Sequence, residues 1–254
     1  MNIEIDSAAY GEVWASDYDQ LYAGRDDSVA LAKFLTDLAP GNTLLEFGVG
    51  TGRLALPLSE AGFAVTGVDA SAKMLDRLRG RPGAERLRII TGDFTTVDAG
   101  GPFDLVLLAF STLFLVPTQA GQLACLASAR RHLRPGGALV VEAFVPDHSR
   151  WARGQNVSVG SLDESGVTLK LSVHDAVTQT ITTQDVLVDH HGTRLRPNVL
   201  RYAWPAELDA MALASGLTPD GRWDGWDRAA FTGRSGSHVS VYRRPPGGPV
   251  DEPR

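Results

Sequence analysis

The stretch Leu44-Leu45-Glu46-Phe47-Gly48-Val49-Gly50-Thr51-Gly52 decides the fold of this chain. It begins with an apolar run over residues 43–47, which predicts a buried strand. Three glycines follow within five positions, and glycine allows a sharp backbone turn and the close approach of a ligand. A helix is predicted directly afterwards, over residues 53–61. A strand, a glycine loop and a helix in this order predict a binding site for a nucleoside-containing ligand at the carboxyl edge of a parallel sheet.

The residues that follow alternate between strand and helix patterns. Strands are predicted over 65–68, 87–90, 103–108 and 138–144, and helices over 72–79 and 118–133. Residues 167–174, 177–189 and 194–202 then alternate every second position, which predicts a three-stranded antiparallel insertion. A helix over 205–215 and a strand over 238–243 complete the pattern. We therefore expect an α/β fold: a Rossmann-like sheet with helices on both faces and an antiparallel β insertion that forms a lid.

The same pattern divides the chain into four expected parts. Residues 1–40 form an N-terminal helical lid segment. Residues 41–148 and 203–244 form the Rossmann-like domain, and residues 149–202 form the insertion. Residues 245–254 are rich in proline and glycine and are predicted to be a disordered tail.

Composition excludes several classes of protein. The chain has 254 residues, 43% of them hydrophobic, which is enough to fill a core. Its net charge of −6, without a basic run, argues against nucleic acid as a partner. Cys125 is the only cysteine, and no apolar run approaches the length of a membrane span. We expect a cytoplasmic protein that acts on neither nucleic acid nor a membrane, and the possibility of a homo-oligomer stays open.

Two carboxylates identify the ligand of the glycine loop. Asp69 follows the second predicted strand about 20 residues after Gly48, where an acid can bind both hydroxyls of a ribose. Arg53 stands where a dinucleotide-binding loop would have its last glycine. Glu46, just before the loop, would repel a pyrophosphate but would attract the cationic amino group of S-adenosylmethionine, directly or through water. We therefore predict S-adenosylmethionine as the cofactor.

Further cofactor contacts follow from the neighbouring strand ends. Asp93 can accept a hydrogen bond from the adenine amino group, and the backbone N–H of Phe94 can donate to the adenine ring. The complete set of predicted cofactor contacts outside the N-terminal segment is Glu46, Gly48, Gly50, Gly52, Asp69, Ala70, Met74, Asp93, Phe94 and Leu108.

On these residues the chain resembles the class I S-adenosylmethionine-dependent methyltransferases, over about residues 42–144 and the last strand. A narrower resemblance lies in Tyr18-Asp19-Gln20-Leu21-Tyr22-Ala23-Gly24-Arg25, which is similar to the start of deoxyaminosugar N-methyltransferases. The spacing of Tyr10 and Tyr18, together with Phe114, is similar to lincosamide N-methyltransferases of antibiotic biosynthesis. These resemblances imply that Tyr10, Tyr18 and Phe114 act at the reaction centre. They also imply that Tyr18 and Arg25 contact the cofactor, Arg25 through the methionine carboxylate.

The chain departs from the aminosugar enzymes in one respect. Those enzymes carry a histidine shortly after the fourth strand, whereas residues 110–115 contain none, which argues against an aminosugar as acceptor. The segment is apolar apart from two hydroxyls, and no cluster in the sequence suggests a metal. An amine supplies its own lone pair, whereas an oxygen nucleophile usually requires a base or a metal. The leading hypothesis is therefore a small-molecule N-methyltransferase that tailors a secondary metabolite.

Several alternatives stay open at this stage. They are an O-methyltransferase on the same fold, a methyltransferase of macromolecules, a dehydrogenase, and a protein that binds S-adenosylmethionine without turnover. Glu142, inside the fifth predicted strand, and His238, at the start of the last one, are further candidates for an acid or a base at the site.

Overall fold

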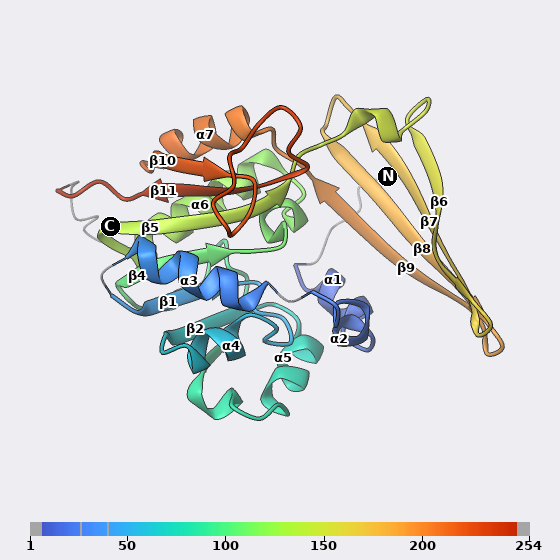
Figure 1. The fold of residues 1–254 in the computed structure, drawn as a ribbon, viewed down its shortest axis with the longest axis horizontal. Helices are drawn as coiled ribbons and strands as arrows, with labels where there is room; N and C mark the ends of the chain where they lie inside the picture. The colour runs from blue at the N-terminus through green and yellow to red at the C-terminus, as the bar shows by residue number, and fades with distance from the viewer. Residues whose placement is uncertain (1–6, 26, 40, 248–254) are drawn as a thin grey trace.

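We analysed a computed structural model of the chain, which describes residues 7–25, 27–39 and 41–247. Most of the predicted tail, residues 248–254, lies outside the described residues. The described part contains two β-sheets and the helices that cover them (Figure 1). The predicted fold class is confirmed: a mainly parallel sheet between helices, with a separate antiparallel sheet inserted after it.

The larger sheet has seven strands in the order β10-β11-β5-β4-β1-β2-β3. Its parallel strands are β1 (Thr43–Phe47), β2 (Ala64–Asp69), β3 (Arg88–Thr91), β4 (Phe103–Leu108) and β5 (Leu133–Phe144). The strand β11 (Ser237–Arg243) runs antiparallel to β5, and β10 (Thr218–Trp223) pairs with β11 at the edge. The carboxyl ends of β1, β2, β3 and β4 therefore lie along one edge of the sheet.

Helices cover both faces of this sheet. One face packs against α3 (Ser28–Leu38), α4 (Ala55–Glu60) and α5 (Ala72–Arg79). The other packs against α6 (Gln119–His132) and α7 (Pro205–Ala214). Strands buried on both faces consist almost wholly of apolar residues, as Phe103–Leu108 does with all six positions buried. The short helix η1 (Ala84–Arg86) precedes β3.

Side-chain hydrogen bonds mark the first residues of two helices, α5 and α6. The Ser71 hydroxyl accepts a bond from the Met74 N–H at 3.2 Å and caps α5, as its position in the sequence predicts. Thr118 caps α6 in the same way, accepting from the Gly121 N–H at 3.0 Å. Pro57 falls in the first turn of α4, where a backbone N–H has no partner within the helix, so it does not break that helix.

Four of the strand predictions need correction. The edge strand β10 was not expected, because Pro219 and Gly221 disrupt its pattern at a register shift. The strand β5 begins at Leu133 and includes Pro135, Gly136 and Gly137, which we expected to separate helix from strand. The insertion has four strands rather than three, and its strand β8 begins at Thr180, after a turn.

The smaller sheet is an antiparallel meander of β6 (Gln155–Asp163), β7 (Gly166–Asp175), β8 (Thr180–Asp189) and β9 (Gly192–Arg201). The strand β6 escaped prediction because a bulge between Val159 and Ser161 interrupts its alternation. The sheet projects from one end of the seven-stranded domain (Figure 1). It is joined to that domain by the segment around η3 (His148–Arg150) and by the residues between β9 and α7.

Two short helices, α1 (Ala9–Trp14) and α2 (Tyr18–Leu21), lie beside the junction of the two sheets (Figure 1). Glu12 on α1 accepts a hydrogen bond from the Ser71 hydroxyl at 2.8 Å. Asp17, just before α2, forms an ion pair with the buried Arg196 of β9. The two helices are thus joined both to the seven-stranded domain, through the start of α5, and to the smaller sheet. The next helix, α3, packs within the core, so only the first part of segment 1–40 has this bridging position.

Candidate active site

A cavity of about 470 Å³ lies at the carboxyl edge of the parallel sheet. Its floor is formed by residues that follow β1, β2, β3 and β4, and its cover by α1, α2 and the strand β9. We call Gly48, Gly50, Asp69 and Asp93 the polar half of the cavity. We call Tyr10, Tyr18, Tyr22, Phe110 and Phe144 the aromatic half.

Asp69, at the end of β2, is held by the backbone of two loops. Its Oδ2 accepts a hydrogen bond from the Gly50 N–H at 2.9 Å, and its Oδ1 accepts one from the Ser71 N–H at 2.9 Å. Burial raises the pKa of Asp69, and these backbone donors act in the opposite direction. Each carboxylate oxygen can accept a second bond, so Asp69 can still bind two hydroxyls of a ligand in the cavity.

The glycine loop leaves room at the cavity floor. Gly48 has a φ of +72°, and a Cβ there would lie 2.6 Å from the Thr112 Cγ2. Gly52 has a φ of +80°, and a Cβ there would overlap Leu78 of α5. A side chain at position 48 would therefore clash with Thr112 at the cavity. A side chain at position 52 would instead clash with α5, against which the loop packs.

Glu46 is the buried acid just before the loop. Its side chain does not line the cavity, and its Oε2 has no hydrogen-bond partner among the described residues. Burial raises the pKa of Glu46 to about 8, although the guanidinium of Arg53 acts against this shift. A buried carboxylate oxygen without a partner favours a cationic group from a ligand, and the cationic amino group of S-adenosylmethionine fits this requirement.

Asp93 and Phe94 lie in the turn that follows β3. The Asp93 Oδ1 accepts bonds from the Thr95 N–H at 2.8 Å and from the Thr95 hydroxyl at 2.7 Å. The other carboxylate oxygen is not used in these bonds. The Phe94 ring stacks on Phe47, with ring centroids 5.5 Å apart. The turn is therefore well ordered by its own contacts and presents a free acceptor at the cavity.

Three tyrosines from α1 and α2 form the cover of the aromatic half. The rings of Tyr18 and Tyr22 lie 4.8 Å apart, and the centres of the Tyr22 and Phe110 rings lie 4.9 Å apart. Burial raises the pKa of Tyr18 to about 12 and that of Tyr10 well above its usual value. Both phenols are thus neutral at physiological pH, so they can orient a ligand through hydrogen bonds but cannot act as bases.

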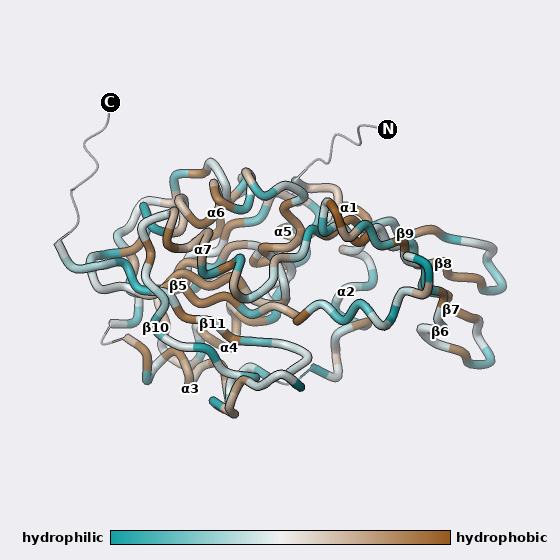
Figure 2. Tube along the Cα trace, turned by 90° about the horizontal axis from the view of Figure 1, so that it is seen from above, coloured by the Kyte–Doolittle hydropathy of each residue, from teal (hydrophilic) through white to brown (hydrophobic). Residues whose placement is uncertain are grey.

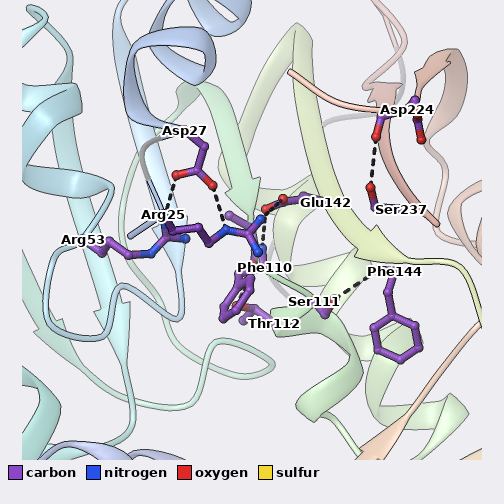
Figure 3. A network of polar contacts seen from close by, with 11 residues as sticks. Arg25, Asp27, Arg53, Phe110, Ser111, Thr112, Glu142, Phe144, Asp224 and Ser237 are labelled. Atoms are coloured by element: carbon purple, nitrogen blue, oxygen red, sulfur yellow. Dashed lines mark hydrogen bonds and ion pairs between the residues drawn. The ribbon is translucent and has the colours of Figure 1, made fainter. Parts of the chain in front are cut away.

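The loop after β4 has a strained backbone. Phe110 and Ser111 have φ values of 52° and 62°, a conformation that side chains other than glycine rarely adopt. The Phe110 N–H donates to the Glu142 Oε2 at 2.7 Å, and the Ser111 hydroxyl accepts from the Phe144 N–H at 3.2 Å (Figure 3). These bonds from β5 hold the loop in place, so that Phe110, Ser111 and Thr112 line the cavity.

An ionic network joins this loop to the N-terminal segment (Figure 3). Arg25 donates to the Glu142 Oε1 at 2.9 Å and pairs with Asp27 at 3.0 Å. Asp27 also pairs with Arg53 at 2.7 Å. The Arg25 guanidinium lies 4.4 Å from the centre of the Phe110 ring. Arg25 is thus engaged by two carboxylates, and its predicted contact with the methionine carboxylate stays a prediction.

The predicted site residues divide into two groups by position. Those that line the cavity are Tyr10, Tyr18, Gly48, Gly50, Asp69, Ala70, Met74, Asp93 and Phe94. Those that lie behind its wall are Arg25, Glu46, Gly52, Leu108 and Phe114. Phe114 is fully buried and packs edge-on against Phe144, with ring centroids 5.1 Å apart, so Phe144 lies between Phe114 and the cavity. The roles of all these residues remain predictions.

The sequence analysis missed several residues of the cavity. Asn198 and Leu200 on β9 line it, as do Val116, Pro117 and Gly121 from the segment that leads into α6 and from the start of that helix. No local signal could have placed β9 there, because its position depends on how the smaller sheet packs against the rest. The alternation of polar and apolar residues in β9 predicts a strand, but it does not predict that this strand lies beside the cavity.

No histidine, cysteine, lysine, arginine or glutamate lines the cavity among the residues that the structure describes. His238 is fully buried in β11, its Nδ1 is hydrogen-bonded to the Ser240 hydroxyl at 2.9 Å, and burial lowers its pKa to about 4. Glu142 is occupied by Phe110 and Arg25. Neither candidate acid or base from the sequence is therefore free to act on a ligand in this cavity.

Comparison with known proteins agrees with this site. Residues 44–137 match the family model described as a methyltransferase domain. The chain is 28% identical over 250 residues to the cypemycin N-terminal methyltransferase of a Streptomyces species, covering 94% of this chain and 99% of that protein. Its structure is similar to that of the CcbJ methyltransferase from Streptomyces caelestis, with a TM-score of 0.88, 38% identity, and coverage of 95% and 100% of the two chains.

A third relative carries the cofactor. This is CalS10 of Micromonospora echinaspora, an amino pentose methyltransferase involved in calicheamicin biosynthesis, whose structure was solved with S-adenosylmethionine bound. Its TM-score is 0.69 and its identity 25%, over 89% of this chain and 96% of that one. The fold and the site thus define a class I methyltransferase. The chain belongs to the S-adenosylmethionine-dependent methyltransferases, and S-adenosylmethionine is its cofactor.

Proposed function

We propose that this enzyme methylates an amine nitrogen of a small-molecule secondary metabolite of the antibiotic type. One observation supports the amine above all: the aromatic half of the cavity contains hydroxyls and rings but no side chain that could serve as a general base. An alcohol or phenol usually has to lose its proton to a base as it attacks. An amine that arrives neutral needs no such group.

The relatives support the same choice. The curated relative that matches nearly the full length of the chain carries the name of an N-terminal methyltransferase, and a similar structure that of an amino pentose methyltransferase. The first name refers to cypemycin, and the second protein is described as involved in calicheamicin biosynthesis. We transfer the nitrogen acceptor and the metabolite class to this chain, but not the particular substrate.

In the proposed mechanism the polar half binds the cofactor. Asp69 would bind the ribose hydroxyls, and Asp93 with the Phe94 N–H would bind the adenine. Glu46 would attract the amino group, directly or through water. When bound, S-adenosylmethionine supplies a methyl group on a cationic sulfur, which leaves as a neutral thioether. Because the leaving group needs no acid, the protein has chiefly to hold the acceptor in line.

The aromatic half would hold the acceptor. Tyrosine and phenylalanine rings stabilise a cationic ammonium through their faces, so the methylated product is favoured there once its nitrogen becomes charged. The neutral hydroxyls of Tyr10 and Tyr18 can accept a hydrogen bond from the amine N–H and orient its lone pair. The helices α1 and α2, with the inner face of the smaller sheet, would act as the lid that excludes water.

The test is a comparison of matched acceptors. Purified enzyme is incubated with S-adenosylmethionine and with amino sugars, cyclic secondary amines and short peptides with a free N-terminus, each paired with its hydroxyl analogue. We expect release of S-adenosylhomocysteine with the amines, and mass spectrometry should place the methyl group on nitrogen. The rate should rise with pH until the acceptor amine is neutral. Turnover of only the hydroxyl analogues would replace our proposal with an O-methyltransferase.

A further inference from the structure

Asn198 on β9 lines the cavity, and the proposed mechanism does not use its side chain. Among the described residues, one side chain bonds to Asn198: the Thr183 hydroxyl donates to its backbone carbonyl at 3.5 Å. The half-buried amide group therefore has no partner there. An amide has two N–H donors and one carbonyl acceptor, and a polar group that loses water without gaining a partner costs free energy. A ligand in the cavity can supply that partner.

The position of β9 places Asn198 on the acceptor side of the cavity. The strand contacts α1, which carries Tyr10, and η2 (Thr112–Leu115), which follows the loop at Phe110. Two perpendicular views show β9 beside α1 (Figure 1, Figure 2). Tyr10 and Phe110 belong to the aromatic half, for which we propose the acceptor. Asn198 thus comes from an element that packs against this half.

The neighbouring residues of β9 hold Asn198 in place. Side chains two positions apart on a strand share a face, so Arg196, Asn198 and Leu200 point the same way. Arg196 is buried and forms an ion pair with Asp17, and its Cζ lies 5.5 Å from the centre of the Trp14 ring. Leu200 lines the cavity. Contacts on both sides of Asn198 therefore fix the amide at the cavity wall.

Asn198 differs from the other hydrogen-bond donors of the cavity. It carries the only side-chain N–H among the described residues that line it. Two of the hydroxyls are already used: Thr95 donates to Asp93 at 2.7 Å, and Thr112 donates to the Ala109 carbonyl at 2.7 Å. The tyrosine hydroxyls are those that we propose to accept from the amine. The amide is thus suited to another atom of the acceptor, one that accepts a hydrogen bond.

The charges of the lining determine which kind of atom this is. Among the described residues, the lining includes the carboxyls of Asp69 and Asp93 but no lysine, arginine or histidine. A carboxylate on the acceptor would therefore be buried without a cationic partner, which is costly. A carbonyl or hydroxyl oxygen is uncharged and accepts from an amide N–H. The cavity of about 470 Å³ also has to hold the cofactor, so this oxygen lies close to the amine.

We propose that Asn198 determines acceptor specificity: its amide N–H donates to an uncharged oxygen, a carbonyl or a hydroxyl, that the acceptor carries close to its amine. This inference rests on the proposed transfer to an amine and adds a second group by which that amine is selected. A site that hydrogen-bonds a polar group of its substrate rejects an analogue without it, because the partner in the protein stays unpaired. Contacts at both the amine and the oxygen would also fix the direction of the attacking lone pair.

The test uses amines of matched shape. Prolinamide carries a carbonyl and prolinol a hydroxyl, and their apolar counterparts are 2-isopropylpyrrolidine and 2-ethylpyrrolidine. Ligand-observed NMR titrations of enzyme saturated with S-adenosylhomocysteine give dissociation constants that do not depend on turnover. We expect wild type to bind at least one oxygen-bearing amine about tenfold more tightly than its counterpart, and Asn198→Leu to lose this preference. Because the amines differ in basicity, each preference is compared between wild type and variant at one pH.

Two further variants test the role of the donor. Asn198→Asp keeps the shape and can accept a hydrogen bond but has no N–H when ionised, so it should lose the preference as Asn198→Leu does. Asn156→Leu is the matched control, because Asn156 is a half-buried asparagine on β6 of the same sheet that does not line the cavity. It should keep the preference. All variants should bind S-adenosylmethionine within about twofold of wild type, which shows that the cavity is intact.

The outcomes separate this inference from the proposed function. Equal binding of the oxygen-bearing and apolar amines by wild type overturns the role of Asn198, as does a preference that persists in Asn198→Leu. A preference that persists in Asn198→Asp shows that position 198 does not act as a donor and also overturns it. Turnover of the same amines is measured by release of S-adenosylhomocysteine from S-adenosylmethionine. Its absence contradicts the proposed N-methylation, whereas a preference lost in Asn198→Leu supports the binding role on its own.

Discussion

The two halves of the active-site cavity are built in different ways. In the polar half, Asp69 and Gly50 are 19 positions apart and are joined by a hydrogen bond of 2.9 Å between adjacent strand ends. In the aromatic half, Tyr10, Phe110 and Phe144 come from separate parts of the chain and meet only through packing. The first half uses a fixed backbone and carboxylates, and the second uses rings and hydroxyls held by ionic contacts.

This difference shows how one fold can keep a cofactor and change its acceptor. The parallel sheet positions the polar half. The aromatic half depends on α1, α2, β9 and the strained loop at Phe110, which lie outside the seven-stranded sheet. We therefore expect variants in the polar half to alter cofactor affinity, and variants in the aromatic half to alter turnover.

The largest effect is expected from Asp69→Ala. Hydrogen bonds to a charged group contribute about 1.5–3 kcal/mol each, so losing two of them should weaken S-adenosylmethionine binding by about 150-fold or more. Isothermal titration calorimetry measures this change. Asp76→Ala is the control, because Asp76 is an exposed acid on α5 that forms an ion pair with Arg79 on the same helix. Unchanged affinity in Asp69→Ala would show that Asp69 does not bind the ribose of the cofactor.

A smaller loss, of about tenfold, is expected from Glu46→Gln above pH 8. Burial raises the pKa of Glu46 to about 8, so the free enzyme holds this carboxyl mostly neutral at pH 7 and mostly charged at pH 9. Only the charged form attracts an ammonium group. Wild-type affinity for the cofactor should therefore rise between pH 7 and 9, relative to the variant. Parallel pH profiles of the two proteins in calorimetry would contradict this role.

The same substitution also changes stability with pH. In the folded protein the pKa of Glu46 is about 8, above its usual value of 4.5. The unfolded chain therefore releases this proton first, and stability is lost as the pH rises from about 4.5 to about 8. Glutamine does not titrate, so the melting temperature of Glu46→Gln relative to wild type should increase over this range. A constant difference across the range would argue that Glu46 is not buried as described.

Tyr18→Phe probes the aromatic half. We expect kcat to fall by about tenfold, because the hydroxyl that we propose to orient the acceptor is lost while the ring remains. The dissociation constant of S-adenosylmethionine should change by less than about twofold, since Asp69 and Asp93 are untouched. Steady-state kinetics and calorimetry on the same preparation separate the two effects. A loss confined to cofactor affinity would show that Tyr18 contacts the cofactor and not the acceptor.

The smallest effect is expected from Glu142→Gln. The amide oxygen can still accept from the Phe110 N–H, but the amide NH2 then faces the Arg25 guanidinium and cannot accept from it, so the ion pair of 2.9 Å is lost. We expect kcat to fall by about threefold, and Glu142→Ala to lower it further because the strained loop loses its support. Equal rates in all three proteins would show that the network of Arg25, Asp27 and Glu142 does not position the loop.

Local sequence was sufficient for the polar half. Glycine is the residue that adopts the positive φ of the loop at Gly48 and Gly52, and acids at strand ends meet at one edge because the strands are parallel. Both signals are short-range, so the cofactor and the fold class could be predicted from the order of residues. The alternation after residue 144 predicted an antiparallel sheet for the same reason, although the bulge in β6 concealed one strand.

Only the tertiary structure decided the aromatic half. Phe114 looks as suitable for the cavity as Phe110, but packing turns Phe110 toward it and places Phe114 behind Phe144. Arg25 and Glu142 are 117 positions apart, and no local pattern shows that they form an ion pair. Alternation likewise shows that a sheet has one apolar face, but not which way that face points. Burial and charge pairing between distant segments depend on the whole fold, and a single sequence does not encode them in any local pattern.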